Sequence, residues 1–287
     1  MVLPFLKGIF MLNKKALVAA AMVCATADPA AAAEESTHTF TSNVGLYSQY
    51  IFRGLTQTNE DPAIQGGMDY SHVPSGFYAG FWGSNISWLR DAAPPQTYDE
   101  GGSLELDLYT GFRGNFGKSD FTYDLGFLYY YYPGDTPPGA IKAHTKEVYG
   151  GVGWKWLTGK YSYSLDDTFG VNDADGTSYL DLSANVPLGE TGLTLGLHYG
   201  IQEYEGSDAR NIGGASNDDI YSYKDWRVSL AYDVGKITKT LTGTTVGVMY
   251  TDTSSADDLG YGSVSQGGAY PTNIADDQVT FWIQRVF

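Results

Sequence analysis

The stretch Leu104-Glu105-Leu106-Asp107-Leu108-Tyr109 alternates strictly between apolar side chains and polar or polar-tipped ones. Successive side chains of a β-strand point to opposite faces, so this pattern predicts a strand with one apolar face and one wet face. The same alternation recurs in Leu180–Val186, in Trp226–Tyr232 and in the closing stretch Val279–Phe287. Helical periodicity is hard to find. The pattern therefore indicates an all-β protein.

Marking every such run predicts about twelve strands of roughly ten or more residues, longer than the usual five or six of soluble sheets. We expect them near 39–53, 62–72, 76–88, 103–113, 120–131, 145–156, 160–169, 177–186, 192–204, 222–234, 241–251 and 276–287. Short turns, most with Gly or Pro, are expected at 73–76, 114–119, 157–159, 187–191 and 235–240. Longer loops are expected between them, at 54–61, 89–102, 132–144, 170–176, 205–221 and 252–275.

This alternation of short and long connections is typical of one fold. Outer-membrane barrels have short periplasmic turns and long extracellular loops, and an even number of antiparallel strands. We therefore expect a transmembrane antiparallel up-and-down β-barrel of about twelve strands in the bacterial outer membrane, surrounded by its lipids. The strand that ends at Phe287 resembles the terminal signal of such barrels, which implies recognition by the barrel-assembly machinery. Arg285 departs from that signal, because an apolar residue is usual two positions before the end.

The first residues have the pattern of an export signal. Lys14 and Lys15 precede an apolar run from Ala16 to Ala27, and Ala31-Ala32-Ala33 offers small residues for cleavage. We expect residues 1–33 to be a signal peptide, with Met11 as the working start, and residues 34–287 to form the barrel. A longer signal and a lipoprotein modified at Cys24 are the alternatives.

Composition excludes several classes of function. The chain of 287 residues has 33 acidic and 17 basic residues and a net charge of -16, so nucleic acid is not an expected partner. One cysteine forms neither an internal disulfide nor a thiolate metal cluster. The four histidines show no metal-ligand spacing, and Asn172–Gly176 does not fit a calcium loop. We expect no cofactor and no metal site.

Strand parity predicts which charged side chains face the lumen. A charge on the lipid face costs about 2–4 kcal/mol at mid-membrane for Arg or Lys, so the charged face of each strand belongs inside. The residues expected to line the lumen and to set its selectivity are Arg53, Asp69, Glu105, Asp107, Arg113, Asp124, Glu147, Lys155, Asp181 and Arg227. Parity adds Asp166, Asp225 and Asp233. Acidic groups outnumber basic ones in this set. An open pore would therefore prefer cations or neutral solutes over anions.

These charged groups have two alternative roles. Small barrels are filled by their own side chains and larger ones leave a channel, and a barrel of twelve strands lies near the boundary between the two. One is the lining of a channel for passive diffusion of small solutes. The other is a network of acid-base pairs that plugs the barrel, leaving a structural, adhesive or loop-binding role.

Several blocks of the sequence resemble one bacterial family. They are Asn43–Gly54, Pro62–Gly67, Gly76–Asn85, Leu104–Gly111 and Tyr132–Gly134, and together they are similar to the TorF family of putative porins. The resemblance covers the mature chain, most specifically its first third, and implies an outer-membrane barrel with passive transport. It names no solute. Arg53 falls in the matched Phe-Arg-Gly block and is the first candidate for a functional lumen residue, with structural pairing to an acid such as Glu105 as the alternative.

Two other interpretations remain as alternatives. Some outer-membrane barrels are hydrolases with Ser and His on adjacent strands, and His198 has Ser183 and Ser229 as neighbours on such strands. No feature marks a nucleophile, so we do not expect an enzyme. The run Tyr129–Tyr132 fits an aromatic girdle at the membrane interface, with a stacking platform for sugars or bases as the alternative.

Overall fold

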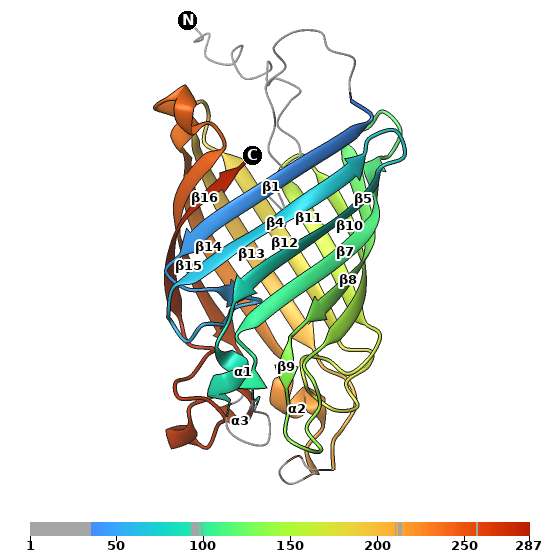
Figure 1. The fold of residues 1–287 in the computed structure, drawn as a ribbon, viewed down its shortest axis with the longest axis vertical. Coiled ribbons are helices and arrows are strands. Elements are labelled where there is room, and N and C mark those ends of the chain that lie inside the picture. Colours follow the sequence, from blue (N-terminus) through green and yellow to red (C-terminus); the bar gives the residue numbers. More distant parts are fainter. Residues whose placement is uncertain (1–35, 93–97, 99, 210, 212–213, 257) are drawn as a thin grey trace, which may run out of the picture.

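The computed structural model describes residues 36–92, 98, 100–209, 211, 214–256 and 258–287 (Figure 1). The expected signal peptide 1–33, with Met11 and Cys24, lies outside these residues. Twelve long strands follow one another along the chain: β1 (His38–Tyr47), β4 (Ala63–His72), β5 (Phe77–Asn85), β7 (Leu104–Asn115), β8 (Phe121–Tyr131), β10 (Thr145–Trp154), β11 (Leu157–Ser164), β12 (Ser178–Pro187), β13 (Leu193–Glu203), β14 (Tyr223–Asp233), β15 (Thr244–Ser254) and β16 (Gln278–Val286).

These twelve strands form one closed antiparallel barrel in sequence order. Closure joins β1 to β16, where Asn43 pairs with Val286 and Tyr47 with Trp282. Each strand otherwise pairs with its neighbours in the chain, as in an up-and-down barrel. The expected fold is thereby confirmed. Closure pairs each long strand on both sides, so the barrel has no free sheet edge.

The remaining elements are short and lie in the connections. They are the two-residue strands β2 (Ile51–Phe52), β3 (Leu55–Thr56), β6 (Glu100–Gly101) and β9 (Gly134–Asp135), the helices α1 (Trp88–Asp91), α2 (Asn217–Tyr221) and α3 (Asp258–Tyr261), and the 3-10 turns η2 (Val234–Lys236), η3 (Lys239–Leu241) and η4 (Val264–Gln266). In Figure 1 all three α-helices lie at one end of the barrel. Among the described residues, the helices are too short to cross a membrane.

The connections alternate between the two ends of the barrel. At the end that we call the turn end, they span 73–76, 116–120, 155–156, 188–192 and 234–243. At the opposite end, the loop end, they span 48–62, 86–103, 132–144, 165–177, 204–222 and 255–277. The start of β1 and the end of β16 both lie at the turn end (Figure 1).

Several strand predictions were wrong at their ends, as in β15, expected at 241–251 and found at Thr244–Ser254. The two largest differences lie in β1 and β11. The first strand stops at Tyr47 rather than at residue 53, because the chain turns into the barrel beyond it. The turn expected at 157–159 lies at 155–156 instead, where Lys155 has φ +55° and Trp154 pairs with Leu157. The strand expected at 160–169 accordingly spans Leu157–Ser164.

The two faces of the barrel wall differ in polarity. Outward side chains are apolar and exposed, among them Leu46 (58%), Val152 (58%) and Phe281 (60%). Polar side chains occupy inward positions of the wall, and Glu105, Glu147 and Asp225 are each no more than 2% exposed. The apolar surface is therefore the outside of the barrel, an inversion of the pattern of soluble proteins.

Candidate functional site: the lumen and its inward hairpin

A short hairpin from the first loop reaches into the barrel. β2 and β3 pair through Ile51 with Thr56 and through Phe52 with Leu55, and Arg53 and Gly54 form the turn between them. Both turn residues have positive φ, +46° and +84°, which is the requirement of a type I′ hairpin turn. We call residues Ile51–Thr56 the inward hairpin.

Arg53 at its tip contacts the opposite wall of the barrel. Nη2 of Arg53 donates to both carboxylate oxygens of Glu147 on β10 at 2.8 Å. Nη1 donates to Oε1 of Gln202 on β13 at 2.9 Å, and Nη2 also lies 3.3 Å from the hydroxyl of Tyr130 on β8. The hairpin leaves the wall between β1 and β4, so these contacts cross the lumen.

Aromatic rings surround the same guanidinium group. Its Cζ lies 4.3 Å from the ring centroid of Tyr179, 4.9 Å from that of Phe52 and 5.7 Å from that of Phe169. Cations over aromatic faces within about 6 Å gain stability, more so when water is excluded. Arg53 is therefore held by an ion pair, hydrogen bonds and ring faces together.

Gly54 allows the hairpin to come this close to the wall. A Cβ atom at this position would lie 2.5 Å from Cβ of Asp225 on β14 and 3.0 Å from Cγ2 of Thr253 on β15. A larger residue would have to push the turn back toward the middle of the lumen. The Arg-Gly pair thus sets both the conformation and the depth of the hairpin.

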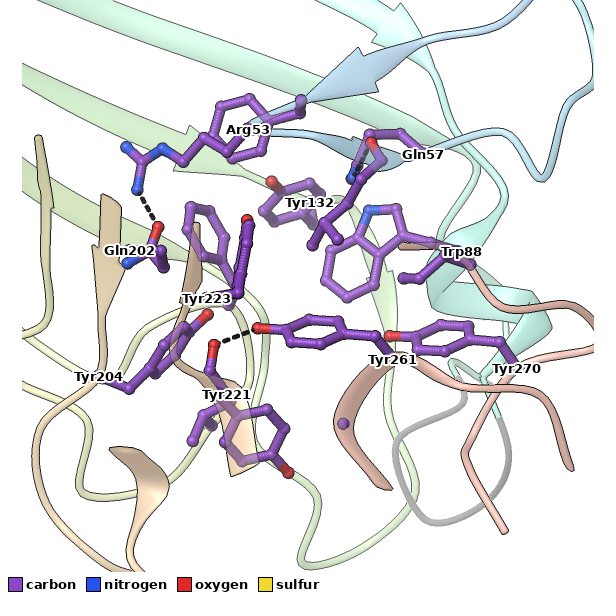
Figure 2. Close-up of a pocket in the computed structure, with 16 residues that line it drawn as sticks. Arg53, Gln57, Trp88, Tyr132, Gln202, Tyr204, Tyr221, Tyr223, Tyr261 and Tyr270 are labelled. Atoms are coloured by element: carbon purple, nitrogen blue, oxygen red, sulfur yellow. Dashed lines mark hydrogen bonds between the residues drawn. The ribbon is translucent and has the colours of Figure 1, made fainter. Parts of the chain in front are cut away.

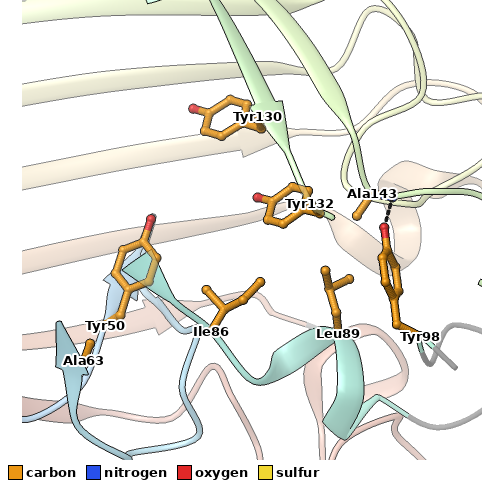
Figure 3. Close-up of a cluster of buried hydrophobic side chains, with 8 residues drawn as sticks. All are labelled: Tyr50, Ala63, Ile86, Leu89, Tyr98, Tyr130, Tyr132 and Ala143. Atoms are coloured by element: carbon orange, nitrogen blue, oxygen red, sulfur yellow. Dashed lines mark hydrogen bonds between the residues drawn. The ribbon is translucent and has the colours of Figure 1, made fainter. Parts of the chain in front are cut away.

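An apolar cluster anchors the base of the hairpin at the loop end (Figure 3). Tyr50 lies in it with Ile86, Leu89 and Tyr132, and all four are buried. The Tyr50 hydroxyl donates to Oε1 of Glu105 on β7 at 2.7 Å, so a buried carboxylate also fixes the start of the hairpin. The position of the hairpin is consequently determined at its base as well as at its tip.

A small pocket lies beside the hairpin, between the loops (Figure 2). Its volume is about 80 Å³. Arg53 lines it together with tyrosines from several loops, and the hydroxyl of Tyr261 donates to the backbone oxygen of Tyr221 at 2.6 Å. Burial raises the pKa of the Tyr261 hydroxyl well above its ordinary value, which keeps it neutral. Aromatic side chains from the loops therefore line this pocket beside the hairpin.

The turn end of the lumen is more accessible. Arg113 and Asp124 face each other across β7 and β8, as do Lys160 and Asp181 across β11 and β12, and all four are only half-buried. Arg113 donates to Oγ of Ser71 at 2.9 Å and lies over the ring of Tyr78 at 4.7 Å. We call the part of the interior that is lined by Arg113, Asp124, Lys160 and Asp181 the turn-end vestibule.

A polar network containing His198 includes Asp181 of this vestibule. Nε2 of His198 is 2.9 Å from Oδ1 of Asp225, and Nδ1 is 3.1 Å from Oγ of Ser183 and 3.4 Å from Oδ1 of Asp181. Ser183 donates its proton to Asp181 at 2.6 Å. The Ser-His neighbours considered from the sequence do meet, but the serine proton is directed to a carboxylate and not to the imidazole.

The residues expected in the lumen have different surroundings. Asp69 accepts from the hydroxyl of Tyr109 at 2.9 Å, Asp124 from that of Tyr78 at 2.6 Å, and Arg227 lies opposite His198. Asp107 is half-buried on the inward face of β7, next to Glu105. Arg53 pairs with Glu147 rather than with Glu105, the acid suggested as its partner.

Three residues expected in the lumen lie elsewhere. Lys155 is exposed in the turn between β10 and β11, with Nζ 4.6 Å from the Trp154 ring. Asp166 lies in a loop, where it pairs with Lys146 at 2.7 Å on the outside. Asp233 is exposed at the turn end and caps η2. Lys160 was not among the expected lining residues, although it lies in the strand expected at 160–169 and has the same parity as Asp166.

The fold and the lumen together define a class of protein. In lipid, backbone polar groups must be paired within the structure, and a closed barrel satisfies this condition. An apolar outer surface around a polar interior is the pattern of barrels that span the bacterial outer membrane. The molecule is a transmembrane β-barrel of this class.

The chain belongs to a family of bacterial proteins of unknown function, Gcw_chp, whose model matches residues 31–287. The TorF name suggested by the motifs is not confirmed by this match. Among proteins with curated descriptions, none matches the sequence significantly.

Among solved structures, the chain is similar to the outer membrane protein OpdK from Pseudomonas aeruginosa, with 16% identity, a TM-score of 0.39, and coverage of 79% of this chain and 58% of that one. It is also similar to OccAB3 from Acinetobacter baumannii, with 10% identity, a TM-score of 0.43, and coverage of 88% and 65%. For OmpF from Salmonella typhi in complex with daunomycin, the identity is 12%, the TM-score 0.37, and the coverage 87% and 97%. The chain thus spans less than two thirds of the length of OpdK and OccAB3.

Proposed function

We propose that this barrel is a channel for passive diffusion of small solutes, narrowed by the inward hairpin. The observation that supports the proposal is a difference in burial along the interior: the charged side chains of the turn-end vestibule are half-buried, whereas those of Arg53 and Glu147 are buried. A filled structural barrel has no need of accessible charges such as Arg113, Asp124 and Lys160. The inward hairpin belongs to a loop and is held in place by side chains. It can therefore narrow the cross-section of the lumen without being part of the barrel wall.

The proposed preference is for cations or neutral solutes. Acidic side chains predominate along the inward faces, with Asp69, Glu105, Asp107 and Asp225 in addition to the paired Glu147. Field lines focus in a narrow bore with low-dielectric walls, so an acidic excess attracts cations and repels anions. Arg113 and Lys160 in the vestibule lie opposite carboxylates, which reduces their attraction for anions.

The proposed orientation places the turn end in the periplasm and the loop end outside the cell, as in other barrels of this class. The last strand supports a role in assembly. Phe287 is 62% exposed at the turn end and exchanges backbone hydrogen bonds with Ser42 at 2.8 and 3.3 Å, while Arg285 lies over its ring. We propose that the assembly machinery reads this strand. Deletion of Phe287 should then reduce insertion in cells without preventing refolding in detergent.

A plugged barrel with a structural, adhesive or loop-binding role is the second candidate. Buried tyrosines favour it, because the loops fill the loop end around the 80 Å³ pocket. In this case the turn-end vestibule would be a cavity that is closed at its inner end. No catalytic role is part of either proposal.

Planar-bilayer conductance of the refolded mature protein tests the choice. The channel proposal expects small, brief steps, with a reversal potential in a salt gradient that indicates cation preference. A folded, heat-modifiable barrel without steps, and without solute uptake into liposomes, would leave only the plugged barrel. Conductance steps with anion preference would support the channel proposal but contradict the proposed preference for cations or neutral solutes.

A further inference from the structure

Two of the four histidines face each other at the turn-end rim. His38 is the first residue of β1 and His72 is the last of β4, and the two are directly opposed in the register of these strands. Their ring centroids lie 5.1 Å apart, with 38° between the ring planes. They are far apart in sequence, so no spacing motif could have shown this pair.

Each of these rings is held by a hydroxyl group at one nitrogen. Nδ1 of His38 lies 2.8 Å from the hydroxyl of Tyr70, and Nδ1 of His72 lies 2.7 Å from Oγ of Ser75. Among the hydrogen bonds of the described residues, both rings use Nδ1 and none uses Nε2. Metal-binding histidines show this arrangement, since a partner at one nitrogen fixes the ring and leaves the other for the metal.

The spacing of the rings fits a shared metal ion. With a metal-nitrogen bond of about 2.0–2.1 Å, an imidazole centroid lies about 3.2 Å from the metal, and two ligands at a tetrahedral angle have centroids about 5.2 Å apart. The observed separation is 5.1 Å. The backbone pairing of β1 and β4 holds the two rings at this distance.

The surroundings keep the pair in place and open to water. Tyr70 stacks on His38, with centroids 5.9 Å apart, and packs against Phe40 and Phe77. His38 is exposed and His72 is half-buried. Water can therefore complete the coordination of an ion that has only two protein ligands.

We propose that His38 and His72 form a binding site for a divalent transition-metal ion, Zn²⁺ or Cu²⁺, on the outer rim of the barrel. Imidazole nitrogen suits both ions, and Cu²⁺ binds more tightly than Zn²⁺ in the general order of affinities. This site is outside the lumen and does not depend on whether the barrel conducts.

Copper titration of the folded barrel, prepared without a histidine tag, tests the site. We expect one Cu²⁺ per chain, with an electron paramagnetic resonance spectrum showing two equivalent nitrogen ligands. His38→Asn and His72→Asn should each weaken binding by more than about 100-fold, because direct ligands contribute more than the outer partners whose loss costs about 10–100-fold. Tyr70→Phe should weaken it within that smaller range.

His144→Asn is the matched control, because His144 lies at the loop end, and it should leave the affinity unchanged. Heat-modifiable migration in gels shows that each variant is folded. Equal copper affinity in the wild type and in both rim variants would overturn the proposal, as would a spectrum with a single nitrogen ligand. Loss of binding in His144→Asn would place the ion elsewhere and overturn it as well.

Discussion

Arg53 and Glu147 form an ion pair across the interior of the barrel, with Nη2 at 2.8 Å from both carboxylate oxygens. Their side chains are only 6% and 2% exposed. One comes from a loop hairpin and the other from the wall, so this pair ties the tip of the hairpin to the wall. Removal of one partner from a buried pair leaves an uncompensated charge.

Arg53→Ala should therefore lower the free energy of unfolding by about 3–5 kcal/mol, measured by urea unfolding in lipid vesicles. The double variant Arg53→Ala/Glu147→Ala should recover part of this loss, because no buried charge remains. Lys155→Ala removes an equal charge from an exposed turn and should stay within about 0.5 kcal/mol of the wild type. Equal losses in Arg53→Ala and Lys155→Ala would contradict the buried ion pair.

Gly54→Ala should move the inward hairpin, because the new Cβ would lie 2.5 Å from Cβ of Asp225. Gly189→Ala is the control, since Gly189 also has positive φ (+65°) but a Cβ added there would meet no atom of a non-adjacent residue within 4 Å. An alanine in this conformation costs about 1–2 kcal/mol by itself, and Gly54→Ala should cost more. Urea unfolding measures both, and the idea fails if the two losses are the same.

Val228→Arg and Ser229→Arg compare the two faces of the wall at the middle of β14. Val228 is 41% exposed on the outside, while the next residue points inward. An arginine facing lipid at mid-membrane should cost about 2–4 kcal/mol, and one in the vestibule clearly less. Folding free energies in phospholipid vesicles measure the difference. The reverse order would show that the faces have been assigned wrongly.

His144 should make the loop end sensitive to acid. It accepts a hydrogen bond from the backbone amide of Tyr132 at 3.2 Å, and burial, with a contribution from Lys142, lowers the pKa of His144 below its ordinary 6.5. The unfolded loop binds the proton more readily, so stability is complete above pH 6.5 and declines as the pH falls toward the lowered pKa. Hydrogen-exchange protection of Tyr132 should fall in this window. His144→Gln should remove this pH dependence.

The wall of the barrel could be predicted from the sequence because its signal is local. In β7 and β14, apolar and polar side chains alternate from residue to residue, and each strand carries its own evidence. The inward hairpin could not be predicted in this way. Tyr50, Ile51 and Phe52 favour a strand by residue type, and this local preference does not show that the chain has left the wall. The Arg-Gly pair, which suits a turn with positive φ, was the available signal.

The contacts of the site depend on distances in the folded structure and not on the spacing of residues along the sequence. Arg53 and Glu147 are 94 residues apart, so parity could place both inside the barrel without pairing them. Lys155, in contrast, was placed inside the barrel although it lies in an exposed turn. Parity was continued one residue beyond Trp154, where the strand had already ended in a two-residue turn. Loop geometry thus limited the prediction of the site more than strand assignment did.

The most direct measurement of the central claim is single-channel conductance of Arg53→Ala beside Lys155→Ala and the wild type. If the hairpin narrows the lumen through its ion pair with Glu147, Arg53→Ala should show larger and longer openings with stronger cation preference, because the freed carboxylate remains in the bore. Lys155→Ala should match the wild type. Identical conductance and selectivity in all three folded proteins would contradict the claim that Arg53 holds the constriction.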